Sequence, residues 1–192
     1  PPATGALVPA RARHRAVWSG TEVLIIGGDP ENRGLRYNPA ANTWSLINPS
    51  NAPAIGSEVH AFWTGTQLIV WDAYHRVGGR YTPGTDTWTA MSDTNAPSAR
   101  AGSSAAFANG YLVVWGGTEA EDEWSYLNTG GRYNPTNNTW IATSLANVPQ
   151  RRAGATATVI GADIIIFGGT TTNLQTGTNV VYGPYSDFGR QD

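Results

Sequence analysis

The chain has no cysteine, and this absence excludes several kinds of chemistry. Without thiols it can form no disulfide, use no thiolate nucleophile and hold no metal through sulfur. Lysine is missing too, so all twelve basic residues are arginine. Charged residues make up 14% of the chain, against about 25% in a typical soluble domain. The net charge is −2, so we expect no nucleic-acid partner.

Long hydrophobic runs are also missing. The longest apolar stretches, such as Ile164–Phe167, have the length of a strand and are far too short to span a bilayer, so we expect no membrane insertion. The first residues, Pro1–Ala3, lack the charged start and apolar core of a signal peptide, and we expect an exported form to have lost its leader. An exported protein and a GC-rich genome would both suit the missing lysine. We expect a bacterial protein in an extracellular or periplasmic location.

What the chain does contain is a repeated stretch. A segment that begins with Arg-Tyr and ends with Thr-Trp occurs at Arg36–Trp44, Arg80–Trp88 and Arg132–Trp140. A degenerate fourth copy follows at Tyr182–Pro184. The tryptophans lie 44 and then 52 residues apart, while each Tyr precedes its Trp by seven. A period of this length fits one four-stranded propeller blade per repeat.

The first repeat predicts four short strands and leaves no room for a helix. Its most apolar segment is expected to be a strand covered on both faces, and the glycine pair that ends this segment gives the backbone freedom for a sharp change of direction. The predicted strands are His14–Trp18, Glu22–Ile26, Leu35–Tyr37 and Thr43–Ile47. The connection after the second strand differs in length between repeats, and residues 118–131 and 170–179 form the longer ones. This predicts variable loops on one face of the blades.

The order of strand, Gly-Gly, variable loop, Tyr-x-Pro and Thr-Trp resembles the kelch repeat over nearly the whole chain. The resemblance implies an all-β, kelch-like β-propeller built from four four-stranded blades. We expect a single domain over residues 1–192, with repeats at about 10–53, 54–97, 98–149 and 150–192. Residues 1–9 are expected to complete the last blade, whose own last strand would hold Phe188-Gly189 in place of Thr-Trp. Two alternatives stay open, a ring that closes on itself and half of a larger ring.

Residues that recur in every repeat are interpreted as structural. The aromatic pairs are expected to pack sheet against sheet, and the glycine pairs to end the second strands. These residues are Tyr37, Trp44, Tyr81, Trp88, Tyr133, Trp140, Gly27, Gly28, Gly116, Gly117, Gly168 and Gly169.

Three arginines occupy equivalent places before the first strand of a repeat. Arg11, Arg100 and Arg152 lie nine or ten residues before a turn glycine, in linkers expected near one mouth of the central channel. Guanidinium groups there would bind a carboxylate or a sugar acid. The alternative is that they bond carbonyls and carboxylates of the next blade, and both interpretations stay open.

The remaining candidates are histidines and one charged loop. The three histidines show no ligand spacing, so we expect no metal and no cofactor, and His14 is either a strand residue or an acid or base. The loop after Thr118 contains the acidic run Glu119–Glu123, which is interpreted as solvated, with Ca²⁺ or a basic partner as the alternative. Trp124 and Tyr126 follow it and are expected to stack on a sugar or grip a peptide.

Three hypotheses of function follow. The first is a non-catalytic binding module of an exported bacterial protein that presents loops to a protein or a glycan, because no nucleophile, base and acid set is recognisable. The second is a sugar-acid enzyme, since some kelch propellers are similar to sialic acid mutarotases; the arginines would then hold the carboxylate, while His14 or a glutamate moves the proton. The third is a structural unit whose incomplete blade edges join copies into a homo-oligomer.

Overall fold

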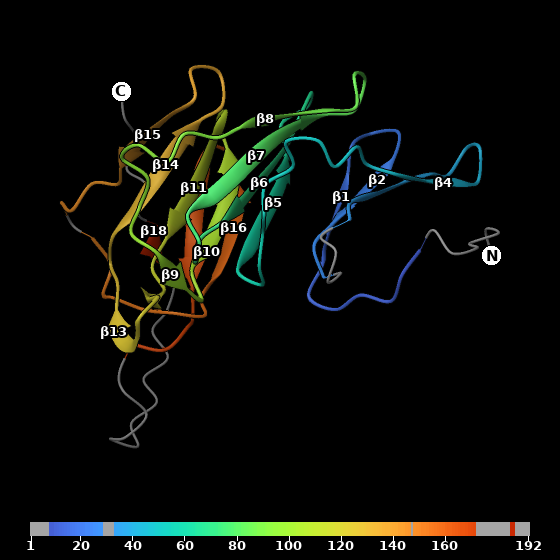
Figure 1. Ribbon diagram of the computed structural model, residues 1–192. Helices are drawn as coiled ribbons and strands as arrows, with labels where there is room; N and C mark the ends of the chain where they lie inside the picture. The colour runs from blue at the N-terminus through green and yellow to red at the C-terminus, as the bar shows by residue number, and fades with distance from the viewer. Residues whose placement is uncertain (1–7, 29–32, 147, 172–184, 187–192) are drawn as a thin grey trace. The chain divides into compact units, whose positions relative to one another are not determined.

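The computed structural model describes residues 8–28, 33–146, 148–171 and 185–186. In this part the chain consists of β-strands and loops, with no helix, as Figure 1 shows. It divides into two compact units, Pro1–Met91 and Ser92–Asp192. The predicted all-β fold of small antiparallel, blade-like sheets is confirmed.

Unit 1 contains two four-stranded antiparallel sheets, each with its strands in sequence order. Blade 1 consists of β1 (Arg15–Trp18), β2 (Val23–Ile26), β3 (Leu35–Asn38) and β4 (Thr43–Leu46). Blade 2 consists of β5 (Val59–Trp63), β6 (Leu68–Asp72), β7 (Val77–Thr82) and β8 (Thr87–Ala90). In blade 1 each predicted strand is found, and its ends differ from the expected ones by at most one residue.

Unit 2 contains two further blades and one smaller sheet. Blade 3 consists of β10 (Ser104–Ala108), β11 (Tyr111–Trp115), β14 (Gly130–Asn134) and β15 (Thr139–Ala142). Blade 4 is described as β16 (Thr156–Ile160), β17 (Asp163–Phe167) and β18 (Tyr185–Ser186). The smaller sheet consists of β9 (Arg100–Ala101), β12 (Thr118–Glu119) and β13 (Asp122–Tyr126), in the order β13-β12-β9.

The repeated aromatic residues pair across the last hairpin of blades 1, 2 and 3. Tyr37 is paired with Trp44, Tyr81 with Trp88 and Tyr133 with Trp140. The ring centroids of these pairs lie 4.8, 5.1 and 5.2 Å apart. Directly opposed residues of an antiparallel pair point to the same face, so the constant spacing of seven is the spacing that places both rings together.

Several expectations fall on residues outside the described part of the chain. They are the completion of the last blade by residues 1–7, the degenerate copy Tyr182–Pro184 and the terminal Phe188-Gly189. Among the residues that are described, no helix has the length and apolar character needed to cross a membrane.

Candidate functional site

The three candidate arginines make the same hydrogen bond in their own repeats. Nη1 of each arginine donates to the carbonyl oxygen of a glycine sixteen residues later, the first of the glycine pair that follows the second strand. The pairs are Arg11 with Gly27 at 3.1 Å, Arg100 with Gly116 at 3.1 Å, and Arg152 with Gly168 at 2.8 Å. The bond therefore ties the linker before each blade to the end of that blade's second strand.

Arg100 shows this contact in its fullest form. Its side chain is 1% exposed and donates two hydrogen bonds to Ser98, two to Thr129 and one to Gly116. Burial lowers the pKa of Arg100 to about 10, and the carboxylate of Glu119 acts in the opposite direction. Arg152 is also 1% exposed, and its Nε donates to the carbonyl of Gln150. In both residues the guanidinium holds main-chain carbonyls, which is a structural use of the charge.

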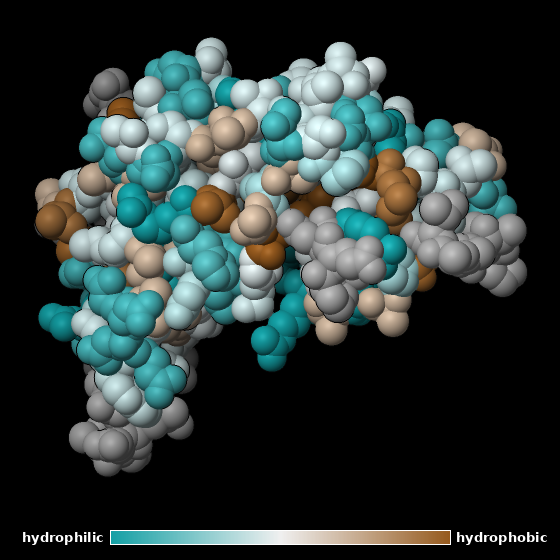
Figure 2. Space-filling view, viewed as in Figure 1, coloured by the Kyte–Doolittle hydropathy of each residue, from teal (hydrophilic) through white to brown (hydrophobic). Residues whose placement is uncertain are grey.

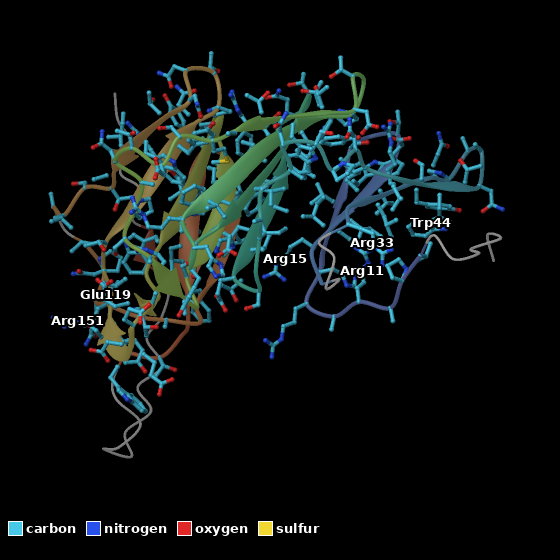
Figure 3. All side chains as sticks on the ribbon, viewed as in Figure 1. Arg11, Arg15, Arg33, Trp44, Glu119 and Arg151 are labelled. Carbon is cyan, nitrogen blue, oxygen red and sulfur yellow. The ribbon has the colours of Figure 1, made fainter. Side chains whose placement is uncertain are left out.

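Arg11 is less buried and lies in unit 1. Its Nη1 donates to the carbonyl of Arg33 as well as to that of Gly27, both at 3.1 Å. Figure 3 shows Arg11 and Arg33 close together below blade 1. Three residues further along the chain, His14 is exposed just before β1 begins.

The second repeat replaces the arginine contact by one of opposite polarity. Gly56 stands at the arginine position and Asp72 at the position of the first glycine, again sixteen residues apart. Here the main-chain N–H of Gly56 donates to Asp72 Oδ2 at 2.5 Å. A Cβ at position 56 would come within 2.7 Å of His75 Cε1, so glycine at this position leaves room for the His75 ring.

Asp72 organises the tight connection between β6 and β7. Its carboxylate is fully buried and accepts hydrogen bonds from the main-chain N–H groups of Tyr74 and His75. His75 Nδ1 donates to Asp72 Oδ2 at 2.9 Å, while the His75 side chain is 53% exposed. Burial alone would raise the pKa of Asp72, but hydrogen bonds from the His75 side chain and from the main chain of Gly56 and His75 outweigh it and lower the pKa.

The sequence analysis did not predict the contact between Gly56 and Asp72. The signal was available, because the arginine and the glycine change together at positions 56 and 72. His60 lies in β5, where burial lowers its pKa to about 4 and the charge of Arg15 adds to the effect. No group of three potential metal-ligating side chains occurs in the part of the chain that the structure describes.

The acidic segment of unit 2 is a hairpin, where the sequence had predicted a solvated loop. β12 pairs with β13 on one side and with β9 on the other. At the start of β13, Asp122 Oδ1 accepts a hydrogen bond from the main-chain N–H of Trp124 at 3.0 Å. Glu119 faces Arg100 across the β12–β9 pair. In Figure 1, β9 and β13 lie at the same end of unit 2.

The hairpin carries the two aromatic residues expected to contact a ligand. Trp124 is 45% exposed, and Tyr126 is partly buried where it pairs with Thr118. The exposed acidic side chains beside Trp124 are Glu121, Asp122 and Glu123. Figure 3 shows Glu119 and Arg151 at this end of the unit. The hairpin therefore offers a large exposed apolar ring that directly follows three exposed acidic residues in the sequence.

Comparison with known proteins bears on the third repeat. Residues 99–142 match the model of the Kelch motif. This segment begins just before β9 and ends with β15, so it includes all of blade 3 and the β12–β13 hairpin. The predicted kelch repeat is confirmed there, and kelch repeats generally mediate protein interactions. No curated protein matches the chain.

Proposed function

We propose that this chain, which carries a kelch motif, is a non-catalytic binding module and that its β12–β13 hairpin contacts a protein partner. The observation that carries the proposal is the exposure of Trp124, at 45%, on a hairpin that no other described blade possesses. The tryptophans of the recurring aromatic pairs in blades 2 and 3, Trp88 and Trp140, are 7% and 3% exposed. Exposed tryptophan on a positioned loop is a frequent anchor of protein interfaces.

The scaffold holds this hairpin in place, which favours binding because less conformational freedom is lost when a partner docks. β12 is bonded to β9, and beside it the main-chain N–H of Ala120 donates to the carbonyl of Ala99 at 3.0 Å. At the base of the hairpin, Leu127 N–H donates to the carbonyl of Gly117 at 2.8 Å. Arg100, at the start of β9, is itself fixed by five hydrogen bonds.

The charge of the hairpin favours a basic partner. Glu121, Asp122 and Glu123 are exposed together next to Trp124. Complementary charge around an apolar anchor raises the association rate and selects against acidic partners, whereas the buried ring supplies more of the affinity. A peptide or protein surface with arginine or lysine residues beside an apolar pocket would match this arrangement.

The test uses the purified chain on an array of peptides with graded arginine and lysine content and, in parallel, on a glycan array. We expect binding to basic peptides, with affinity that falls as salt rises. Trp124→Ala should weaken binding at least about tenfold. Glu121→Gln with Glu123→Gln should mainly lower the association rate; Asp122 is left intact because its side chain accepts the hydrogen bond from the main-chain N–H of Trp124.

Leu145→Ala is the matched control, because Leu145 is 64% exposed in unit 2 but lies outside the hairpin. This variant should bind as the unchanged chain does. Equal binding by Trp124→Ala, or no binding to any basic peptide, would contradict the proposal. Trp124-dependent binding on the glycan array alone would replace the protein partner by a glycan.

A further inference from the structure

The blades of each unit pack face to face, and their contacts show what covers a blade. In unit 1, Leu24 and Ile26 of blade 1 are 0% and 3% exposed and belong to one apolar cluster with Leu68, Val70 and Tyr81 of blade 2. Arg36 of blade 1 also donates to the hydroxyl of Tyr81 at 3.1 Å. The face of one blade that carries Leu24 and Ile26 thus covers the aromatic face of the next.

The same packing is found in unit 2. Val113 and Trp115 of blade 3, at 6% and 2% exposure, form an apolar cluster with Ile164 and Ile166 of blade 4. Trp115 corresponds to Ile26, because each is the last residue before the first glycine of its pair. We call the face with Leu24 and Ile26, or with Val113 and Trp115, the donor face, and the aromatic side of a blade the acceptor face.

One hydrogen bond recurs at both interfaces. Arg15 Nε donates to the carbonyl of Val59 at 2.7 Å, and Ser104 Oγ donates to the carbonyl of Ala155 at 2.7 Å. Arg15 and Ser104 are equivalent, since they pair with Ile26 and Trp115 respectively. The acceptors are equivalent too. Val59 lies 44 residues after Arg15, and Ala155 lies 51 residues after Ser104. Each stands one position before the residue that matches the donor in the next blade, which is His60 in blade 2 and Thr156 in blade 4. An interface between blades therefore has an apolar centre and, among its hydrogen bonds, this recurring one from a side chain to the main chain.

Blade 4 has a donor face that the described part of the chain leaves uncovered. Phe167 stands at the position of Ile26 and Trp115, yet it is 48% exposed. Ile160, which the strand register places on the same face, is 61% exposed. Thr156 pairs with Phe167 and so occupies the hydrogen-bonding position of Arg15 and Ser104, and it too is exposed.

Blade 1 has the complementary surface, which the described part of the chain covers at Leu35 but leaves exposed elsewhere. The register of β1 to β4 places Trp18, Tyr37, Trp44 and Leu46 on its acceptor face. Trp18 is 52% and Leu46 is 42% exposed. Hydrophobic residues reach the surface in separate patches in the view of Figure 2, and most of the remaining surface there is polar. The carbonyl that would accept the recurring hydrogen bond belongs to His14, which precedes Arg15 as Val59 precedes His60.

We propose that these two faces are the halves of a heterologous interface between copies of this chain. The donor face of blade 4 on one copy would cover the acceptor face of blade 1 on a second copy. Phe167 and Ile160 would then pack against Trp18 and Leu46, and Thr156 Oγ1 would donate to the main-chain carbonyl of His14. A second copy fits because the interface continues the packing of blades within each unit, with the same equivalent positions on both sides.

The mass of the purified chain in solution tests this by light scattering after gel filtration. We expect about twice the 20.4 kDa of one chain. Phe167→Arg should remove the donor face and Trp18→Arg the acceptor face, and each variant should have the mass of one chain. Both residues are about half exposed, so the charge is tolerated in the fold, and circular dichroism with a thermal melt checks this. Ile160→Arg replaces Phe167→Arg if the latter does not fold.

Mixing the two variants provides the decisive measurement. One copy still has its acceptor face and the other its donor face, so the mixture should form a two-chain species although each variant alone does not. Leu145→Arg, at an exposed position of unit 2, should keep the mass of the unchanged protein. A single-chain mass for the unchanged protein would overturn the proposal, and so would a mixture that remains at one chain.

Discussion

The strongest quantitative prediction concerns the three equivalent arginines. We replace each by Met, which retains most of the volume of the aliphatic stem and removes the guanidinium. For Arg100→Met the carbonyls of Gly116 and Ser98 lose the guanidinium donor at a site that is 1% exposed, while the carbonyl of Thr129 keeps its hydrogen bond from the main-chain N–H of Gly116. A buried acceptor left without a partner costs about 1 to 3 kcal/mol. Since such costs are not additive, we expect a loss of about 3 to 5 kcal/mol in the free energy of unfolding.

The other two positions should follow in order of burial. Arg152→Met should cost about 2 to 4 kcal/mol, because Arg152 is equally buried and holds the carbonyls of Gly168 and Gln150. Arg11→Met should cost about 1 kcal/mol, because Arg11 is only partly buried and water can replace the guanidinium. Arg100→Lys should lie between Met and the unchanged chain, since one ammonium cannot reach carbonyls that a planar guanidinium bonds together.

Urea unfolding followed by tryptophan fluorescence measures all four variants, and the eight tryptophans supply the signal. An Arg100→Met variant within about 0.5 kcal/mol of the unchanged chain would refute the structural assignment. It would also restore the hypothesis that these guanidinium groups are available to bind a carboxylate.

Three further predictions concern buried polar groups and one glycine. Burial, reinforced by Arg15, lowers the pKa of His60 to about 4, so between pH 6.5 and 4 the unfolded chain binds a proton that the folded chain does not. The free energy of unfolding should therefore fall by about 3 kcal/mol as the pH is lowered through this window, which a pH series of urea midpoints measures. His60→Gln should lack that loss. The lowered pKa of Asp72 adds stability that is present above its ordinary value of 3.8 and lost as the pH falls through the folded value; Asp72→Asn should be less stable at neutral pH and lose less in acid, and equal acid profiles would contradict this. Gly117→Ala should lower the thermal midpoint and cost about 2 kcal/mol or more, because φ is +93° and the new Cβ would lie 2.5 Å from the carbonyl of Ala101; an unchanged melt would show that this turn relaxes.

The blades could be predicted because each depends on local pairing. A Tyr and a Trp seven residues apart face each other across the hairpins of β3–β4, β7–β8 and β14–β15, and the turn between them is short. The second strands were recognisable as nearly continuous apolar runs, such as Val23–Ile26. These signals repeat, so agreement between copies strengthened each one.

The hairpin and the Asp72 contact were not predicted, for a different physical reason. Glu119–Glu123 has the composition of a solvated loop, and its strands form because β9 supplies hydrogen-bonding partners from a linker about twenty residues earlier. The contact of Asp72 with Gly56 likewise joins residues sixteen positions apart, which meet only in the folded blade. Non-local pairing of this kind leaves no periodic pattern in the sequence.

The second repeat separates what every blade requires from what one blade alone has. In every blade a hydrogen bond joins the preceding linker to the end of the second strand. In blades 3 and 4 an arginine donates to a carbonyl, whereas in blade 2 a main-chain N–H donates to a carboxylate. A contact that recurs with interchangeable chemistry belongs to the fold, so a specific ligand must be sought among features that occur once, such as the β12–β13 hairpin. The exposed aromatic and apolar residues of blades 1 and 4 occupy recurring positions whose usual covering blade is missing in the described part of the chain. Phe167 and Trp18 occupy interface positions while being about half exposed, and a second blade is the surface that those positions cover elsewhere in the chain.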